Sequence, residues 1–385
     1  MTEKLFYHDS HLKEFEAHVV SCENAGDLFK IVLDKTVFFP EGGGQYADTG
    51  VLGGVNVLDV HEKNDIIYHT TDAPLEPGVK VSGKINWEER FEKMQQHTGE
   101  HIISGIVNER FGYQNVGFHL SGDYCTMDFN GPITKEQLKE IELEANKAVF
   151  QNLDIDVSYP SKEVLAQMEY RSKIEIEGQV RIVTVPGYDV CACCAPHVKK
   201  TGEIGLIKLV NMANYKGGVR ITMLCGFRAL RDYDKKDANI KEISAALCAK
   251  ELETAQAVLH LKEEAASLKG KIANLQQKMM AYRANEIKVD EEITIVFDSE
   301  LSGNGPRELM NLLLDKGAKV SAVFAGTENN GYRYVIGSRE MDVRPLSKKI
   351  NAAFHGRGGG KPEMVQGSLT GSENEIVSVL KEEMK

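Results

Sequence analysis

The sequence predicts a mixed α+β protein built from four successive parts, and three patterns carry that prediction. Short β-prone runs separated by glycine, proline and asparagine turns fill residues 1–88. Helical and β-prone segments alternate over residues 89–230 and again over 288–385, whereas 231–287 reads as one long helical stretch. We therefore expect a small β-barrel, an α+β domain, a helical linker and a small C-terminal α/β domain, in that order.

The composition is that of an ordinary globular protein with more than one domain. The chain has 385 residues, of which 42% are hydrophobic and 27% charged, with no bias towards disorder or repetition. Its amino terminus lacks the apolar core of a secretion signal, and no run approaches the roughly 18 apolar residues of a membrane span. We therefore expect a cytoplasmic protein with no membrane partner.

Charge and cysteine content narrow the classes of partner. The net charge of −11 opposes an extended nucleic-acid interface, because phosphate contacts need Lys and Arg. One local exception is residues 339–361, where six basic side chains outnumber two acidic ones; a solvated basic face is the alternative. The seven cysteines are an odd number without a secretion signal, which argues against a disulfide framework.

The elements of the first two parts follow from local patterns. The runs FKIVLDKTVFF, GVLGGVNVLDV and DIIYHTT are typical of barrel or sandwich strands. A helix is expected over 87–111, and a second from Thr134 to Phe150, where Thr134 and Gln137 form a capping pair. Further strands are expected near residues 117–129, 154–159, 180–185, 204–211 and 218–224.

The third part is free of proline from about residue 231 to 285 and rich in Ala, Leu, Lys and Glu. Its apolar residues hold heptad spacing: Val258, Leu261, Ala265, Leu268, Ile272, Leu275, Met279 and Tyr282. An unbroken helix of this length would extend roughly 75–80 Å. A rigid spacer, a helical hairpin and a coiled coil that forms a homodimer all remain open.

The fourth part alternates the β-like runs ITIVF, KVSAVFAG and YRYVIGS with helices near 306–316 and from about Pro345, which predicts a small α/β domain. The last helix is followed by the glycine-dense segment GRGGGKPEMVQGS, residues 356–368. We expect this segment to form a glycine loop, because repeated glycines permit close backbone approach and positive φ angles.

A candidate metal site begins with His97 and His101. Their spacing of four within the expected helix places both imidazoles on one face, about one turn apart. The run DVCACCAPH adds Cys193 four residues before His197, and three nitrogens with one sulfur form a plausible tetrahedral zinc set. Pro196 cannot lie deep in a helix, so we expect Cys193 in a loop and His197 near a helix start.

The same residues admit three alternative roles. The zinc could be purely structural, or the thiols could bind no metal, and Cys191 and Cys194 are rival ligands. The letters HTGEH also match the H-x-x-E-H signature of inverzincin peptidases, with Glu100 as general base and Glu175 or Glu177 as the missing ligand. That hypothesis leaves CACCAPH and the glycine-rich run EGGGQ without a role.

The run TVFFPEGGGQY, residues 36–46, ends a β-prone segment in a proline turn and three glycines. Such a loop lets the backbone amides of Gly42, Gly43 and Gly44 approach a carbonyl or a terminal adenosine, and Gln45 can both donate and accept hydrogen bonds. A tight turn with no ligand is the simpler interpretation of the loop taken alone.

Together these motifs resemble a known family. TVFFPEGGGQYADTG, QQHTGEHIIS and CCAPHVKKTGEIGLIKL, in this order, are similar to the editing domain shared by alanyl-tRNA synthetases and the alanyl-tRNA editing proteins of the AlaX type. That resemblance covers about residues 1–230. The helical stretch and GRGGGKPEMVQGS further resemble the C-terminal tRNA-binding domain of alanyl-tRNA synthetase, as in the long AlaX form.

The resemblance implies a set of roles for individual residues. His97, His101, Cys193 and His197 would bind one zinc ion, and Gln45 and Thr36 would lie beside the substrate amino acid. Arg357, Gly358, Gly359, Gly360 and Lys361 would contact tRNA. Where the family usually reads C-G-G-T-H, this chain has C-C-A-P-H, which removes two glycines and adds a thiol.

The expected activity is hydrolysis of mischarged tRNA(Ala), chiefly seryl-tRNA(Ala) and in addition glycyl-tRNA(Ala). A synthetase pocket for alanine cannot strongly exclude glycine or one extra hydroxyl, so a second hydrolytic site is needed. The sequence holds no segment for an ATP-dependent aminoacylation domain before the β-rich part, so we expect no charging activity. A non-catalytic zinc-containing tRNA-binding protein is the alternative from another class.

Overall fold

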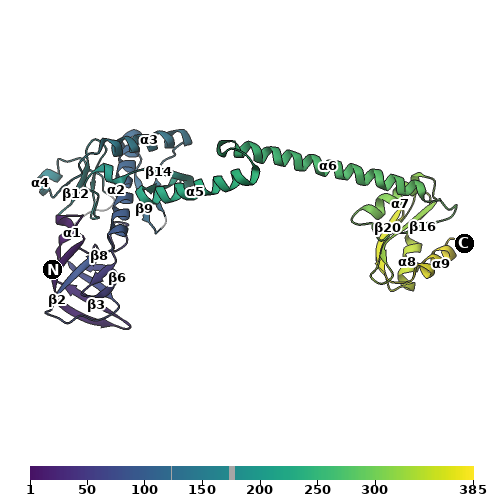
Figure 1. The fold of residues 1–385 in the computed structure, drawn as a ribbon, viewed down its shortest axis with the longest axis horizontal. Helices are drawn as coiled ribbons and strands as arrows, with labels where there is room; N and C mark the ends of the chain where they lie inside the picture. The colour runs from purple at the N-terminus through teal and green to yellow at the C-terminus, as the bar shows by residue number, and fades with distance from the viewer. Residues whose placement is uncertain (123, 173–177) are drawn as a thin grey trace. The chain divides into compact units, whose positions relative to one another are not determined.

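The computed structural model describes residues 1–122, 124–172 and 178–385 (Figure 1). The chain forms two compact units, Met1–Glu242 and Ile243–Lys385. Helices and strands alternate in both, which confirms the mixed α+β class. Among the described residues, none of the helices combines the length and the apolar character that a membrane span requires.

The first unit begins with an antiparallel sheet whose strand order is β2-β3-β7-β6-β5-β8. Because β8 pairs with both β5 and β2, this sheet closes on itself as a barrel. The strands are β2 (Glu14–Ala25), β3 (Leu28–Leu33), β5 (Gly50–Leu52), β6 (Val55–Lys63), β7 (Ile66–Thr71) and β8 (Lys80–Ile85). A short parallel pair, β1 (Glu3–Lys4) and β4 (Lys35–Thr36), flanks the helical turn α1 (Leu5–His8).

The long helix α2 (Trp87–Phe111) follows the barrel directly and has the bounds that the sequence predicts. Its first turn is capped by the side chain of Asn86, which accepts a hydrogen bond from the Glu89 amide. It ends at Gly112, whose φ of +70° gives the left-handed conformation typical of helix ends. From Arg90 to Val107 every side chain is buried except two half-buried ones near the start of the helix. The helix therefore lies in the centre of the unit, with other elements on all its sides.

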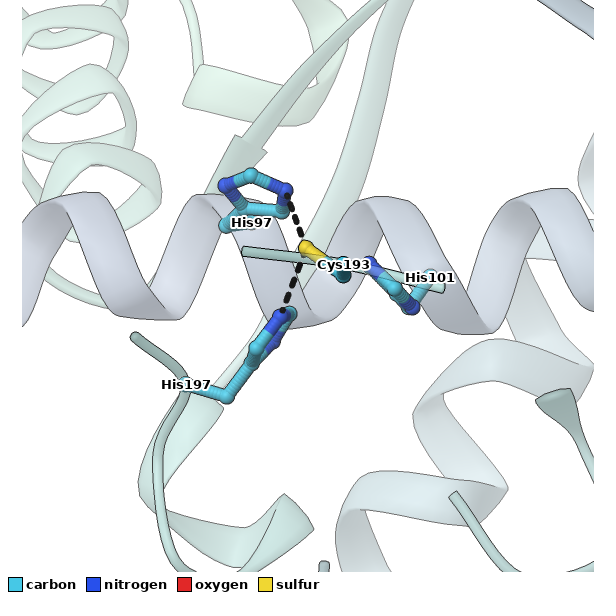
Figure 2. A group of neighbouring side chains, drawn as sticks. All are labelled: His97, His101, Cys193 and His197. Atoms are coloured by element: carbon cyan, nitrogen blue, oxygen red, sulfur yellow. Dashed lines mark hydrogen bonds between the residues drawn. The ribbon is translucent and has the colours of Figure 1, made fainter. Parts of the chain in front are cut away.

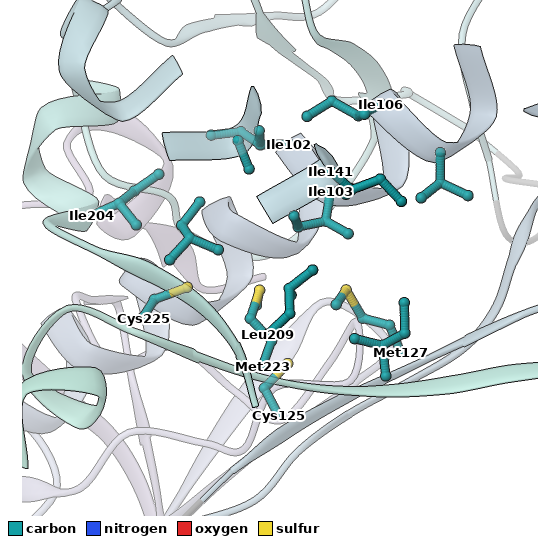
Figure 3. Packing of buried hydrophobic residues seen from close by; sticks show 14 of the residues in the cluster. Ile102, Ile103, Ile106, Cys125, Met127, Ile141, Ile204, Leu209, Met223 and Cys225 are labelled. Atoms are coloured by element: carbon teal, nitrogen blue, oxygen red, sulfur yellow. The ribbon is translucent and has the colours of Figure 1, made fainter. Parts of the chain in front are cut away.

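Two sheets and further helices surround α2. The four-stranded sheet has the order β14 (Ile207–Tyr215), β15 (Gly218–Cys225), β10 (Cys125–Phe129), β9 (Asn115–Leu120), and the smaller sheet the order β11 (Asp156–Ser158), β12 (Ile182–Val185), β13 (Asp189–Ala192). The helices are α3 (Lys135–Gln151), α4 (Lys162–Leu165) and the 3-10 turn η1 (Thr201–Ile204). Thr134 and Gln137 cap α3 reciprocally, as predicted. Figure 3 shows α2 isoleucines packed with side chains of this larger sheet and of α3.

A buried ion pair joins α2 to the segment between β4 and the barrel strand β5. Arg90 Nε lies 2.9 Å from a carboxylate oxygen of Asp48, and its Nη2 donates to the carbonyl of Val37 at 2.8 Å. Asp48 also accepts from the amide of Phe39 at 2.7 Å. Both charged side chains are essentially inaccessible to water.

Replacing Arg90 with methionine is expected to lower the free energy of unfolding of the first unit by about 3–5 kcal/mol, because it leaves the Asp48 carboxylate buried and unpaired. Urea unfolding followed by the fluorescence of Trp87, the single tryptophan, measures this. The matched control is Arg231→Met, which removes an exposed partner of Glu92 and should cost no more than about 1 kcal/mol. Equal losses in the two variants would contradict the prediction.

The long helical stretch predicted from about residue 231 to 285 consists of two helices, so it is not one unbroken helix. These are α5 (Gly226–Leu247) and α6 (Thr254–Glu286), separated by the 3-10 turn η2 (Glu251–Glu253). Cys248 adopts a positive φ of 50°, which ends α5. On α6 the heptad side chains of Leu268, Ile272 and Leu275 are exposed within the second unit.

The second unit ends in a five-stranded sheet of order β16 (Thr294–Phe297), β17 (Val320–Thr327), β18 (Gly331–Ser338), β20 (Met364–Leu369), β19 (Arg357–Lys361). Its helices are α7 (Gly305–Asp315), α8 (Arg344–Ala353) and α9 (Glu373–Glu383), and the last of these was not expected from the local pattern. The α/β alternation is as predicted, and β16 and β17 are parallel and joined through α7.

The prediction of a glycine loop at 356–368 is wrong, because Arg357–Lys361 form an edge strand that pairs with β20. A side chain at Gly358 would collide with the hydroxyl of Tyr334, and one at Gly360 would collide with the carbonyl of Met364. The glycines therefore allow neighbouring groups to approach the backbone of a strand closely, and they do not form a loop.

Candidate metal centre

Four side chains from two distant segments meet beside the middle of α2 (Figure 2). His97 and His101 lie one turn apart on α2, and Cys193 and His197 lie on the loop after β13. One ligand atom from each lies within 4.8 Å of every other. The Cys193 Sγ is 3.5 Å from His97 Nε2 and 3.4 Å from His197 Nε2. Cys193 lies in a loop, as predicted, and His197 lies four residues before the 3-10 turn η1.

The distances fit a tetrahedral zinc ion. With Zn–S near 2.3 Å and Zn–N near 2.05 Å, a sulfur and a nitrogen on adjacent corners are about 3.6 Å apart. The two measured separations, 3.5 and 3.4 Å, are close to that value. Three imidazoles and one thiolate also match the donor types that zinc prefers over magnesium or calcium.

Each imidazole is oriented by a hydrogen bond at its other nitrogen. His97 Nδ1 lies 3.2 Å from Gln45 Oε1 and His101 Nδ1 lies 2.9 Å from Asp189 Oδ2. His197 Nδ1 lies 3.0 Å from Thr98 Oγ1. Such outer contacts fix the tautomer that leaves Nε2 free for a metal.

The electrostatic surroundings prepare the donor atoms. Burial lowers the pKa of His197 to about 3, which keeps this imidazole neutral. Burial by itself would raise the pKa of the Cys193 thiol, but the imidazoles of His97 and His197 hold it well below its ordinary value. Burial would likewise lower the pKa of His101, yet Asp189 and the neighbouring thiols raise it well above the usual range. Metal binding would therefore release a proton from His101.

Outer residues that the sequence did not single out hold this cluster in place. Arg171 donates two hydrogen bonds to the Asp189 carboxylate, at 2.7 and 2.8 Å. Arg181 donates from Nη1 to the carbonyls of Cys193 and Ala195, at 2.8 and 2.9 Å, and so fixes the ligand loop. Asp189 is the first residue of the DVCACC run, and this position beside the cysteines is the one feature of the sequence that could have indicated its role.

The predicted glycine loop at Gly42–Gly44 forms a tight hairpin turn beside the cluster. The backbones of Gly42 and Gln45 exchange two hydrogen bonds of 3.0 Å. Gly43 and Gly44 have φ of +61° and +81°, as a type I′ turn requires. A side chain at Gly44 would collide with Phe118, whose ring is tilted against that of His97 with 4.8 Å between the ring centres.

Gln45 lies within this site and is fully buried. Its Oε1 faces His97, whereas its Nε2 has no hydrogen-bond partner among the described residues. An unpaired buried N–H group costs about 1–3 kcal/mol, and this one is available to donate a hydrogen bond to a bound group.

Thr36 is also fully buried, but its hydrogen bonds connect it to the barrel. Its Oγ1 lies 2.8 Å from His69 Nε2 and accepts from the Phe38 amide at 3.1 Å. His69 Nδ1 faces the carbonyl of Ile31 at 3.1 Å, and burial lowers its pKa to about 4. The neutral ring therefore donates from Nδ1 and accepts the hydroxyl hydrogen of Thr36 at Nε2, which leaves Thr36 one acceptor position.

The rival residues lie differently from Cys193. Cys191 groups with His101 and Asp189, and burial raises the pKa of its thiol to about 11. The Cys194 thiol is turned towards the Gly42–Gly43 backbone. Glu100 is held through Oε1 by Ser104 at 2.7 Å and by Asn115, with Oε2 3.8 Å from His101 Nε2. The proposed peptidase ligands at 175 and 177 lie outside the described residues.

Replacing Asp189 with asparagine is expected to weaken zinc binding about 10–100-fold, because it removes the charged acceptor of His101. Competition with a chromophoric chelator measures the dissociation constant. Asp156→Asn, at an exposed position of the same small sheet, is the control and should leave affinity unchanged. An unaltered affinity in the Asp189 variant would exclude His101 as a ligand held in this way.

Three family models match successive parts of the chain. Residues 3–89 match class II (A) tRNA synthetases, 180–222 the second additional domain of threonyl- and alanyl-tRNA synthetases, and 290–385 the DHHA1 domain. The candidate metal ligands Cys193 and His197 fall within the second match. The fold and the site therefore define a protein assembled from synthetase-related domains.

Relatives over the full length narrow this class. The alanyl-tRNA editing protein AlaX-L of Pyrococcus horikoshii is 28% identical over 100% of this chain and 99% of its own. The alanyl-tRNA editing protein Aarsd1 of Rattus norvegicus is 27% identical over 94% and 93%. The alanine–tRNA ligase of Pyrococcus abyssi is 30% identical over 96% of this chain but only 42% of the ligase.

Over its whole length the chain is similar to the alanyl-tRNA editing proteins of the AlaX type, and the matched domains relate it to alanyl-tRNA synthetase. Among solved structures, the C-Ala domain of Aquifex aeolicus alanyl-tRNA synthetase matches 25% of this chain and 93% of its own, with 23% identity and a TM-score of 0.21.

Proposed function

We propose that this protein hydrolyses the ester bond of mischarged tRNA(Ala), chiefly seryl-tRNA(Ala) and in addition glycyl-tRNA(Ala). The observation that carries the proposal is the buried cluster of His97, His101, Cys193 and His197 beside the unpaired amide of Gln45. It occurs in a chain that resembles alanyl-tRNA editing proteins over its whole length.

The four cluster residues would hold one zinc ion per chain, which would supply positive charge to orient the amino group or the carbonyl of the substrate. Gln45 would donate from Nε2 to the ester oxygen that becomes negative when water attacks. The backbone amides of Gly43 and Gly44 make no hydrogen bond to a described residue, so they would also be available to donate to that oxygen. Thr36 would accept from a seryl hydroxyl through its remaining acceptor position.

Selectivity for serine follows from hydrogen bonding. A site that pairs a substrate hydroxyl rejects the analogue that lacks it, because the polar group of the site is then left unpaired. Alanyl-tRNA(Ala) would therefore be spared, and glycyl-tRNA(Ala), which also lacks the hydroxyl, would be hydrolysed more slowly than seryl-tRNA(Ala).

A panel of charged tRNAs tests the proposal. Seryl-tRNA(Ala) should be deacylated at least about 10-fold faster than alanyl-tRNA(Ala), the lower range for discrimination by one group. A chelator should stop the reaction and added zinc should restore it. Equal rates would reject the selectivity, and no hydrolysis of any charged tRNA would reject the function.

A non-catalytic tRNA-binding protein is the second candidate, and one observation favours it. Four protein ligands close a tetrahedral zinc site to water, as in structural zinc sites. Under that hypothesis the metal is needed for folding and the panel above shows no turnover with the metal bound.

We further propose that residues 357–361 and the exposed face of α6 provide the contacts outside the hydrolytic site. Arg357, Gly358, Gly359, Gly360 and Lys361 are all exposed on an edge strand, accessible to tRNA. The exposed heptad residues of α6 would pair two chains as a homodimer. Sedimentation equilibrium of the full chain, with and without charges introduced at Leu268 and Ile272, tests the dimer.

A further inference from the structure

A cleft of about 370 Å³ opens on the sheet of the second unit, where β18, β20 and β19 lie side by side. Its lining includes Arg333, Arg357 and His355, with the polar side chains of Asn330, Ser368 and Thr370 between them. Among the described residues, none that lines the cleft is acidic. The cleft is therefore a concave surface of positive charge in a chain whose net charge is −11.

The strand register places the two arginines on one face in a single row. Ser368 of β20 is the direct partner of Arg333 on β18 and of Arg357 on β19. Residues paired directly across strands point to the same side of a sheet, and neighbouring strands lie about 4.8 Å apart. The two arginines thus flank one hydroxyl, and their backbones are about 10 Å apart. Arginine side chains are long enough for both guanidinium groups to reach one ligand placed between them.

The core accounts for the direction in which these side chains face. Tyr332 and Tyr334 alternate with Arg333 and are buried against α8 and α9, so Arg333 points to the opposite face. The Tyr332 hydroxyl is hydrogen-bonded to Glu373, but this contact lies on the tyrosine side. His355 adopts a φ of +50° just after α8, which turns the chain into β19.

Both arginines lack a counter-charge. In the part of the chain that the structure describes, neither Arg333 nor Arg357 forms an ion pair with a carboxylate. Three other arginines of this unit do: Arg283 with Asp298, Arg339 with Asp315, and Arg344 with Asp342. Two unpaired guanidinium groups in one row repel each other unless an anion lies between them.

We propose that this cleft binds a phosphate group, with Arg333 and Arg357 contacting its oxygens and Ser368 donating a hydrogen bond. A guanidinium fork matches phosphate geometry and the hydroxyl completes the contact. The phosphate belongs either to a polynucleotide backbone or to a free phosphate compound. The polynucleotide alternative rests on the tRNA contact proposed above for Arg357 and assigns it to this cleft, whereas neither alternative depends on the proposed hydrolysis.

The test uses the full chain and two probes: uncharged tRNA, followed by fluorescence anisotropy over a range of salt, and inorganic pyrophosphate, followed by calorimetry. Arg333→Gln and Arg357→Gln are compared with Arg344→Gln, which removes the same charge from a paired, exposed arginine. If the backbone is the ligand, each cleft variant weakens tRNA binding about 3–10-fold and reduces the slope of log K against log salt by about 0.7–0.9. Pyrophosphate then fails to bind the wild type.

If a free phosphate compound is the ligand, the wild type binds pyrophosphate, both cleft variants lose that binding, and tRNA affinity is unchanged. Either result supports a phosphate site and identifies its source. If both cleft variants match Arg344→Gln with both probes, the proposal is overturned. Uncharged tRNA requires no hydrolysis, so failure here and failure of the deacylase proposal are distinguishable.

Discussion

Replacing Cys193 with alanine is expected to remove bound zinc and to reduce deacylation of seryl-tRNA(Ala) by more than about 100-fold. That figure is the upper end of what loss of an outer partner of a metal ligand costs, and a ligand itself should cost more. The reason is geometric, because Cys193 Sγ contacts the Nε2 atoms of both His97 and His197. Metal content by atomic absorption and the rate of deacylation are the two measurements.

The neighbouring cysteines provide matched controls for this variant. Cys194→Ala and Cys191→Ala each remove one thiol, one and two residues from Cys193, and both variants should retain about one zinc ion per chain. The Cys194 thiol faces the glycine hairpin, and Cys191 groups with Asp189 and His101 and is not one of the four cluster residues. If Cys194→Ala loses the metal and Cys193→Ala keeps it, the ligand set is wrong.

The helix that carries half of this site could be predicted from sequence because its information is local. Residues 87–111 hold a capped, glycine-terminated helical pattern, and the spacing of His97 and His101 fixes their common face. Cys193 and His197 could be added because they form a second local motif. What brings the two motifs together is the packing of β13 against α2, which no local pattern encodes.

The outer contacts could not be predicted for the same reason. Gln45 is 52 residues from His97 and Asp189 is 88 residues from His101, so each pair depends on the complete fold. The helix break at Cys248 has no glycine or proline to mark it, and the residue takes a positive φ that few side chains favour. In β19, local glycine preference predicts a loop, but the neighbour Tyr334 requires glycine within a strand.

Replacing Gln45 is expected to lower kcat for seryl-tRNA(Ala) about 100- to 1,000-fold, the range seen when one donor to a developing oxyanion is removed. The two variants are Gln45→Met, which removes the whole amide, and Gln45→Glu, which keeps an acceptor for His97 but replaces the free Nε2 donor. Zinc content and thermal stability should change little, because Gln45 contacts the metal site only through His97 Nδ1. KM should change less than kcat, since the donor acts on charge that develops in the transition state.

The pair of variants separates a catalytic donor from a merely structural side chain. If Gln45 served only to orient His97, Gln45→Glu would restore that hydrogen bond and retain activity, and only Gln45→Met would lose metal. If the unpaired Nε2 is the working group, both variants lose turnover with the metal bound. The wild-type structure favours the second outcome, because a fully buried amide keeps an N–H group without a partner where a shorter or apolar side chain would remove that cost.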